Sequence, residues 1–391
     1  MRPGYLMTPG PTPVPPEVEA AMGRPIVYHR GPEFKEILER VLEKLARVCL
    51  TSSPVALFTA SGTGAMESAV ANLVSPGQRV LVVSAGSFGE RWVQIVQRYG
   101  GALEHLRYEW GATPDPDDIA KRLRTSGARV VYCTHCETST GVVSDVRAIA
   151  GCAKAAEAVC VVDAISSLGA VRLEQDEWGI DVVVSGSQKA LMTPPGLALA
   201  SVSSTALEAS RLCSTPRFYF DWERIVKAQG DLLTAFTPAI SLVCGLDAAL
   251  DLLLEDGVES AWGRSALLGR ACRAGVKAMG LELFSPDQDR SAVVTVIRVP
   301  PGVDGTAVVR GARENGVTVA GGQGELKSKI VRVGHVGYIG IDDVSAALEV
   351  LEDAFASAGA SLARGRAADR AREVHAQAAA IDARLASPDL A

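Results

Sequence analysis

The sequence predicts an α/β protein: a mostly parallel central sheet covered by helices on both faces, plus a smaller α+β domain toward the C-terminus. Two patterns predict it. Short apolar runs rich in valine alternate with helix-length segments rich in alanine, which is typical of parallel strands buried on both faces. A second, shorter alternation follows a long helical stretch. With 391 residues, the chain has room for two or three domains.

The composition argues against several classes of protein. With 48% hydrophobic and 21% charged residues, the chain is typical of a globular protein with a large core, not of a disordered or fibrous one. Its net charge of −6 and its lack of a basic stripe argue against nucleic-acid binding. No apolar run reaches the roughly 18 residues needed to span a membrane, and the first residues lack the pattern of a secretion signal. We therefore expect a cytoplasmic protein with no membrane or nucleic-acid partner.

The eight cysteines do not form the dense pattern of a disulfide framework in a chain this long. Cys133 and Cys136 have CxxC spacing, but no second pair follows at the distance of a zinc site. Cys133 also ends an apolar run, which favours a buried thiol over a metal or redox role. We expect no metal site.

The elements of the large domain follow in a consistent order. Six prolines within residues 1–16 predict an extended arm that neither forms a helix nor donates to a sheet. Apolar residues at helical spacing between 33 and 48 predict an amphipathic helix. Further helices are expected at 65–73 and 148–158. The predicted strands of the central sheet are Val55–Thr59, Val80–Val83, Val130–Cys133, Cys160–Asp163, Asp181–Ser185 and Leu197–Val202.

The second alternation follows helical patterns that extend from 241 to 279. Its expected elements are a strand at 293–299, a helix at 306–315, strands at 317–320 and 330–333, and a helix at 342–356. We therefore divide the chain into an N-terminal arm (1–16), a large domain (17–255), a small domain (256–358) and an Ala- and Arg-rich extension (359–391). The extension is expected to be a surface helix or a loosely held segment.

Ligands of a parallel sheet bind beyond the carboxyl ends of its strands, so the residues after each strand are the candidates for function. The first predicted strand continues into Ser61, Gly62 and Thr63 and then into a helix. Small residues, hydroxyl groups and the free N–H groups of a helix N-terminus fit a phosphate. A turn that needs glycine for its backbone angles would give the same pattern. Glu67 argues against a dinucleotide fingerprint, because it stands where a third small residue would be required.

Two charged residues follow two of the other strands. Asp163 ends a fully apolar strand, where a carboxylate is costly to bury unless a cation or a strong donor meets it. It is either the counter-ion of a protonated ring nitrogen or a cap for the next turn. Lys189 lies among small and apolar residues, and partial burial would make its neutral amine available for a Schiff base, unless it is a solvated surface lysine. The two residues are one strand–helix unit apart, so we expect them at the same sheet edge.

These features together predict one cofactor. A phosphate cup, a carboxylate for a ring nitrogen and a lysine for an aldehyde are what pyridoxal 5′-phosphate (PLP) needs. A polar cluster at 134–141 follows another strand at the same edge. On these motifs the sequence resembles the class V, fold-type I PLP aminotransferases, and among them the alanine/serine–glyoxylate aminotransferase branch. The resemblance extends from about Leu6 to about residue 358 and rests on TPGPTPVPPEV, SGTGAMESAVANL, THCETSTG, VVDAISSLG, SGSQKALMTPPG and IVRVGHVG.

The resemblance implies roles in cofactor binding. Lys189 would form the Schiff base with PLP and Asp163 would pair with the pyridinium nitrogen, which makes them the catalytic residues. Phe88 would stack on the cofactor ring, with plain core packing as the alternative. Thr138 would contact the ring hydroxyl. The phosphate site would be lined by Ser61, Gly62, Thr63, Ser187 and Gln188.

The resemblance also implies which residues bind the substrate and contact a partner subunit. Arg332, on a strand between Val331 and Val333, would grip the substrate carboxylate, with an exposed edge arginine as the alternative. Thr237 would reach the phosphate of the neighbouring subunit, which implies a homodimer with shared active sites, or it only caps the turn before Pro238. The segment Tyr28, His29 and Arg30 resembles one near the active-site mouth, and a loop without a function is the other interpretation.

The expected function is PLP-dependent transfer of an amino group from a small amino acid, of alanine or serine type, to a 2-oxo acid such as glyoxylate or pyruvate. Several stretches also resemble pyridoxamine–pyruvate aminotransferase, and an aminotransferase of specialised metabolism is a further alternative. A class V lyase or desulfurase would need a mobile cysteine, but Cys213, Cys244 and Cys272 lie in apolar, helical surroundings. A cofactor-free scaffold and a nicotinamide dehydrogenase are the weaker alternatives.

Overall fold

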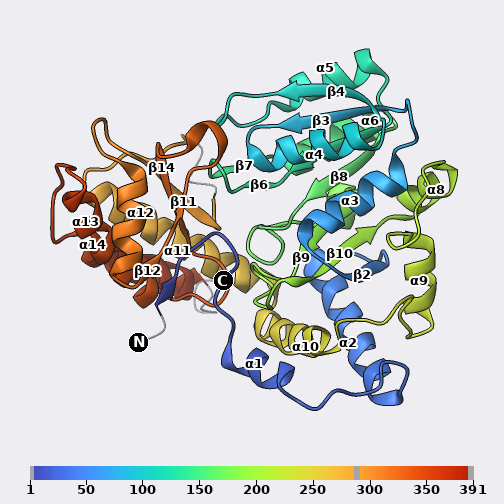
Figure 1. Ribbon diagram of the computed structural model, residues 1–391, viewed down its shortest axis with the longest axis horizontal. Helices are drawn as coiled ribbons and strands as arrows, with labels where there is room; N and C mark the ends of the chain where they lie inside the picture. The colour runs from blue at the N-terminus through green and yellow to red at the C-terminus, as the bar shows by residue number, and fades with distance from the viewer. Residues whose placement is uncertain (1–3, 286–290, 386–391) are drawn as a thin grey trace.

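The computed structural model describes residues 4–285 and 291–385, and its largest feature is a seven-stranded sheet (Figure 1). The strands lie in the order β2 (Val55–Ala60), β10 (Gly196–Val202), β9 (Val182–Gly186), β8 (Val159–Asp163), β5 (Val130–Thr134), β3 (Arg79–Ser84) and β4 (Ala102–Arg107). Neighbouring strands are parallel except where β10 pairs, because β10 lies antiparallel to both β2 and β9. The predicted mostly parallel sheet is confirmed.

The strand residues pack alternately into two hydrophobic cores, one on each face of the sheet. In β5, Val130 and Tyr132 belong to one core, and Val131 and Cys133 belong to the other. The first core is closed by α3 (Gly62–Leu73), α4 (Ser87–Arg98), α8 (Ser204–Leu212) and α9 (Trp222–Gly230). The second is closed by α2 (Pro32–Cys49), α5 (Pro116–Ser126), α6 (Val146–Ala155) and α10 (Ile240–Leu254). Because the side chains on both faces of these strands are buried, such strands need an uninterrupted apolar run.

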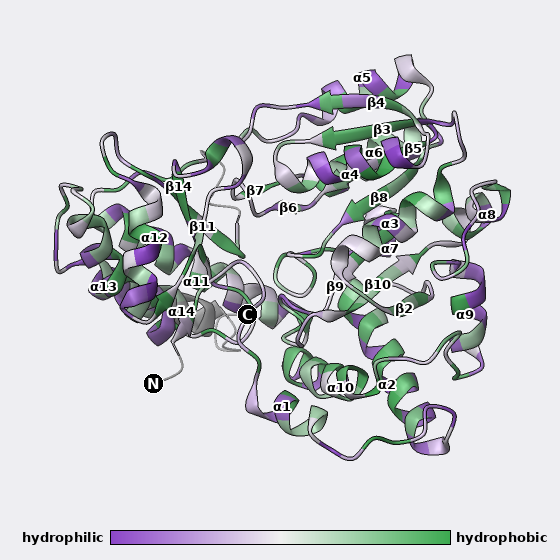
Figure 2. Cartoon of the chain, viewed as in Figure 1, coloured by the Kyte–Doolittle hydropathy of each residue, from purple (hydrophilic) through white to green (hydrophobic). Residues whose placement is uncertain are grey.

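The edge strand β4 is the main element of the sheet that the sequence analysis did not predict. Its residues are only half-buried or exposed, and polar side chains interrupt its apolar pattern. Figure 2 shows purple segments in β4, whereas β3 beside it is mostly green. An edge strand packs on one neighbour only and can keep polar side chains, so it lacks the signal that identifies the central strands.

The small domain is built on an antiparallel sheet in the order β11 (Val294–Arg298), β14 (Ile330–Gly334) and β13 (Ala320–Gly321). Around it lie α11 (Val258–Ala278), α12 (Gly305–Glu314), α13 (Ile341–Ser357) and the short helix η2 (Gly324–Leu326). A further short helix, α7 (Gln175–Trp178), belongs to the large domain. The C-terminal extension forms α14 (Ala367–Leu385), which packs against α11 and α13 and buries Ala367 and Ala371 in the core of this domain. The remaining residues of the extension, 386–391, lie outside the described part.

The N-terminal arm joins the small domain to the large one. Its strand β1 (Tyr5–Leu6) lies parallel to β12 (Val317–Thr318), and Tyr5 and Met7 donate backbone hydrogen bonds of 2.8 Å to the small domain. The expectation that the arm donates to no sheet is therefore wrong at these two positions, because each keeps the N–H group that proline lacks. Helix α1 (Pro16–Met22) then begins at a proline and packs on α10.

Two small hairpin strands, β6 (Cys136–Glu137) and β7 (Val142–Val143), follow β5 and complete the large domain on the side that faces β14. Within residues 4–285 and 291–385, no helix combines the length and the hydropathy required to cross a bilayer.

Candidate active site

Lys189 lies in the turn between β9 and β10 and is buried, with 8% of its surface exposed. Its Nζ donates a 3.1 Å hydrogen bond to the Ser166 hydroxyl, which belongs to the segment after β8. Burial lowers the pKa of Lys189 to about 8, and the nearby charge of Asp163 opposes this shift. At pH 8 roughly half of such amines are neutral, compared with less than about 1% for a free lysine. The amine is therefore available as a nucleophile and as a base.

Asp163 ends β8, and its carboxylate is 4% exposed. One oxygen, Oδ1, accepts a 2.9 Å hydrogen bond from the backbone N–H of Ile165. Burial raises the pKa of Asp163 to about 7, because the Ile165 bond and the charges of Lys189 and Arg91 compensate the lost hydration only in part. A cationic N–H placed against this carboxylate would supply the missing partner.

The start of α3 forms a cradle at the same sheet edge. Ser61 occupies the N-cap position without a side-chain cap, and no acidic residue lies in the first turn, so the free N–H groups there face no negative charge of the helix itself. Gly186 at the end of β9 lies directly behind it: a Cβ there would be 3.3 Å from the backbone nitrogen of Gly62 and 2.9 Å from Oε1 of Gln188. The close approach of β9 to α3 therefore depends on a residue without a side chain.

Phe88 lies in the first turn of α4, with its ring centroid 5.9 Å from Nζ of Lys189. The guanidinium of Arg91 lies over the same ring at 4.9 Å and donates a 3.0 Å hydrogen bond to Oγ1 of Thr63. Arg91 thus joins the α3 cradle to the ring that faces the lysine.

Arg332 lies on β14, the central strand of the small sheet, and is 6% exposed. Its neighbours Val331 and Val333 face the core of the small domain, so Arg332 projects toward the large domain. There Nη1 donates to the carbonyl of Thr138 at 3.0 Å, and Nε donates to the carbonyl of Gly321 at 2.9 Å. Burial lowers the pKa of Arg332 to about 10, against the opposing charge of Glu137. The alternative of an exposed edge arginine is therefore excluded.

The N-terminal arm forms another wall of the site. The Thr12 hydroxyl donates to the carbonyl of Lys189 at 3.0 Å, and the Thr12 N–H donates to the carbonyl of Gln188 at 3.2 Å. Gly10 has a φ of 144°, and a Cβ at this position would collide with Cε and Cδ of Lys189. The arm therefore packs against the lysine side chain itself.

Comparison with known proteins decides the family. The family model described as aminotransferase class-V matches residues 5–338. The chain belongs to the class-V aminotransferase family.

Individual relatives match most of the chain, and two of the three named below are aminotransferases. A Synechococcus sp. protein named "soluble hydrogenase, small subunit" is 40% identical, over 90% of this chain and 93% of its own length. Serine–glyoxylate aminotransferase of Hyphomicrobium methylovorum is 34% identical, over 98% and 97%. The crystal structure of ureidoglycine–glyoxylate aminotransferase from Bacillus subtilis gives a TM-score of 0.92 at 30% identity, covering 95% of this chain and 98% of that one. The predicted family is confirmed.

Class-V aminotransferases are PLP-dependent, so this enzyme is a PLP-dependent transaminase, as predicted. The residues present at the site fit the cofactor. Among the described residues, the buried Oγ1 of Thr138 has no hydrogen-bond partner. The Asp163 carboxylate needs a cation, and the α3 cradle offers N–H groups to an anion. An aldehyde carried by a protonated ring with a phosphate arm would meet each of these needs.

Two residues predicted for cofactor binding lie in other surroundings. The Ser187 hydroxyl donates to the carbonyl of Pro194 at 2.7 Å and accepts from the N–H of Leu197 at 3.3 Å, so it braces the lysine turn. Thr237 is exposed and borders a separate hollow, with Thr59, Tyr219 and Phe236. Tyr28 is exposed as well, next to His29. Neither Thr237 nor Tyr28 is brought to the Lys189 site of its own chain.

Four site residues were missed by the sequence analysis: Gly10, Arg91, Glu137 and Ser166. Each acts through a contact with a residue far away in sequence, and such contacts leave no local pattern. A signal did exist for Gly10, Glu137 and Ser166, because they lie within the motifs TPGPTPVPPEV, THCETSTG and VVDAISSLG.

The cysteines considered for a lyase are in surroundings unsuited to a thiolate. Burial raises the pKa of Cys272 to about 11, and Cys213 donates its S–H to the carbonyl of Ala71. Cys136, of the CxxC pair, lies close to the site, and burial raises its pKa to about 12. A nucleophilic thiol needs the opposite shift.

Proposed function

We propose that this transaminase transfers an amino group from a small amino acid, of the alanine or serine type, to a 2-oxo acid such as glyoxylate or pyruvate. One observation carries the proposal: the buried amine of Lys189, the buried carboxylate of Asp163 and the buried guanidinium of Arg332 face one site between the two domains. Relatives named serine–glyoxylate and ureidoglycine–glyoxylate aminotransferase support glyoxylate as an acceptor.

Lys189 is the group proposed to attach the cofactor and to move the proton. When bound, PLP supplies a protonated ring that withdraws electrons from the substrate Cα and makes its proton acidic. The Nζ of Lys189, with its lowered pKa, would accept that proton and return it to the neighbouring carbon of the cofactor. Asp163 would keep the ring nitrogen protonated, since its carboxylate lies buried at the end of β8.

The remaining predicted residues would hold and orient the ligands. The N–H groups at Ser61, Gly62 and Thr63, with the Gln188 side chain, would bind the phosphate. Phe88 would cover one face of the ring, and the free hydroxyl of Thr138 would meet the ring hydroxyl. Arg332 would hold the substrate carboxylate, because its Nη2 is left over from the bonds made by Nε and Nη1.

The homodimer with shared sites belongs to the same proposal. Phe218, Tyr219 and Phe236 form an aromatic cluster next to Thr237, and Phe218 is 65% exposed. An exposed aromatic cluster of this kind is typical of an interface. A partner seated there would receive Thr237 near its own phosphate site. Cytoplasmic action is also proposed, since all eight cysteines are free thiols, as in a reducing compartment.

The substrate class is tested by a panel of amino donors. Alanine, serine, aspartate and pyridoxamine are each mixed with the purified holoenzyme, and the loss of the visible absorbance of the lysine-bound cofactor is followed. Glyoxylate or pyruvate is then added to measure its return. We expect the fastest half-reaction with alanine or serine. A preference for pyridoxamine would contradict this proposal and favour the alternative function, that of a pyridoxamine–pyruvate aminotransferase.

The lysine assignment is tested by Lys189→Ala. We expect the variant to lose both the visible absorbance of the lysine-bound cofactor and turnover, because neither covalent attachment nor proton transfer can then occur. A spectrum and an activity assay on the purified variant measure this. Full transaminase activity in the variant would disprove the assignment.

A further inference from the structure

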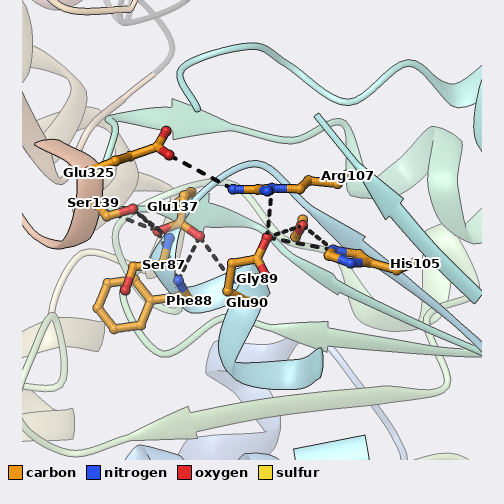
Figure 3. A network of polar contacts seen from close by, with 10 residues as sticks. Ser87, Phe88, Gly89, Glu90, His105, Arg107, Glu137, Ser139 and Glu325 are labelled. Carbon is orange, nitrogen blue, oxygen red and sulfur yellow. Dashed lines mark hydrogen bonds and ion pairs between the residues drawn. The ribbon is translucent and has the colours of Figure 1, made fainter. Parts of the chain in front are cut away.

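Glu137 is a buried carboxylate that the functions described so far do not use. It is 2% exposed and lies in the β6–β7 hairpin, one residue before Thr138. Figure 3 shows it at the start of α4 with the residues that surround it. Oε2 accepts from the N–H groups of Phe88 at 3.0 Å and Gly89 at 2.9 Å, and Oε1 accepts from the Ser139 hydroxyl at 2.5 Å.

The approach of this carboxylate to α4 is built into the backbone. A Cβ at Gly86 would lie 2.5 Å from Cγ and Cδ of Glu137, so only glycine leaves room for it. The Ser139 hydroxyl also accepts a 2.9 Å hydrogen bond from the N–H of Ser87. Three consecutive N–H groups at the start of α4 are thus satisfied by one hairpin, which fixes the helix turn that carries the Phe88 ring.

The same hairpin also holds Arg332. The carbonyl of Thr138, the next residue after Glu137, accepts the 3.0 Å hydrogen bond from Nη1 of Arg332. The charge of Glu137 is also the influence that opposes the loss of hydration at this guanidinium. A substitution at Glu137 would therefore affect Arg332 of the small domain as well as the start of α4.

We propose that Glu137 is a positioning residue that aligns both the Phe88 ring and the Arg332 guanidinium through the one hairpin it anchors. Its carboxylate holds the first turn of α4 by hydrogen bonds, and the hairpin presents the Thr138 carbonyl to Arg332. The importance of this alignment for catalysis rests on the proposed function, in which Phe88 covers the cofactor and Arg332 binds the substrate carboxylate.

Glu90 provides a matched control in the same helix turn. Its carboxylate accepts from the Ser84 hydroxyl at 3.0 Å. It also pairs with Arg107 at 3.3 Å, as Figure 3 shows, and it accepts no bond from Phe88 or Gly89. Glu90→Gln therefore removes one negative charge from the first turn of α4 without touching the Glu137 hydrogen bonds.

The experiment compares Glu137→Gln with Glu90→Gln in three measurements. Hydrogen exchange of the Phe88 and Gly89 amides is measured in the apoenzyme, PLP affinity is measured by titration of the apoenzyme, and KM and kcat are measured with a carboxylate-bearing donor. In Glu137→Gln an NH2 group replaces one acceptor oxygen, so we expect about ten-fold faster exchange, about ten-fold weaker PLP binding and about ten-fold higher KM. Glu90→Gln should match the wild type.

A double-mutant cycle with Arg332→Lys tests whether Glu137 also aligns the Arg332 guanidinium. If Glu137 acts on the donor carboxylate through Arg332, the effect of Glu137→Gln on KM shrinks in the Arg332→Lys background, while the exchange of the Phe88 amide stays fast. Should Glu137→Gln fail to fold, Ser139→Ala weakens the same hairpin and is expected to shift all three measurements in the same direction.

The outcomes separate the positioning role from the function on which it rests. Unchanged exchange at Phe88 and Gly89 would overturn the positioning role. Faster exchange with wild-type PLP affinity and KM would overturn its catalytic importance, while leaving the lysine chemistry, which Lys189→Ala tests separately, untouched. If Glu90→Gln has the same effects, they come from the loss of a negative charge in the first turn of α4. That result would also overturn the proposal.

Discussion

At the scale of single residues, burial creates the chemistry of the site. It lowers the pKa of Lys189 to about 8 and raises that of Asp163 to about 7. The pKa values of the two groups, which ordinarily differ widely, are therefore similar here. The sequence could predict both residues, because a charge at the end of an apolar strand is visible in the pattern. Ser166 and Glu137 lie within quoted motifs, but the sequence could not predict what they contact, because their partners are set by tertiary structure.

The lowered pKa of Lys189 predicts how fast the apoenzyme attaches PLP. Only the neutral amine attacks the aldehyde, so the attachment rate should rise with pH and level off above about pH 8. Stopped-flow absorbance with excess PLP measures this. A rate that still climbs steeply at pH 10 would mean that the lysine behaves as an ordinary exposed amine.

The Asp163→Asn variant tests the carboxylate. An amide cannot carry the charge that stabilises a protonated ring nitrogen, so we expect PLP to bind while proton removal from the donor slows by roughly 10²-fold or more. Single-turnover absorbance with a deuterated donor isolates this step. A rate close to that of the wild type would contradict the role given to Asp163.

At the scale of elements, predictability follows burial. The central strands β5 and β8 are buried on both faces and were predicted from their apolar runs. The edge strand β4 and the two-residue strand β1 were not, because polar residues or prolines hide them and their pairing depends on distant partners. The arm shows this most clearly: its prolines predict an extended segment, but no local signal places it against Lys189.

The arm gives a prediction of its own at Gly10. In Gly10→Ala the new methyl group would collide with the Lys189 side chain and the backbone would be strained at a φ of 144°, so we expect weaker PLP attachment. Titration of the apoenzyme with PLP measures it. Gly151→Ala, on α6 with open space around it, is the matched control and should bind PLP normally. Equal affinities in the two variants would show that the arm is not packed as described.

At the scale of the whole molecule, the site needs both domains. Lys189, Asp163 and the hairpin come from the large domain, and Arg332 comes from the small one. The sequence analysis expects a division into a large and a small domain because the two α/β alternations are separated by long helices. The proposed association of two chains is different: its evidence is exposed aromatic residues such as Phe218, which no local sequence pattern distinguishes from ordinary surface.

The proposed dimer predicts the effect of Phe218→Asp. A carboxylate in the aromatic cluster would lose its hydration in an interface, so we expect a shift toward monomer and a parallel loss of activity, since Thr237 then cannot reach the partner site. Light scattering over a range of concentrations measures the mass. Lys121→Asp, on α5 at the opposite face of the sheet, is the control and should stay associated. A fully associated and active Phe218→Asp would place the interface elsewhere.

The antiparallel strand β10 has a consequence for the tolerance of the turn that carries Lys189. In the parallel part of the sheet, a strand is followed by a helix, and the connection can lengthen without disturbing the pairing. Between β9 and β10 both ends of the connection enter neighbouring strands that are hydrogen-bonded to each other, from Gly186 paired with Ala198 onward. One inserted residue there would either move the Lys189 amine or shift the register between β9 and β10. This loop is therefore expected to keep a fixed length even where other surface connections of the molecule vary.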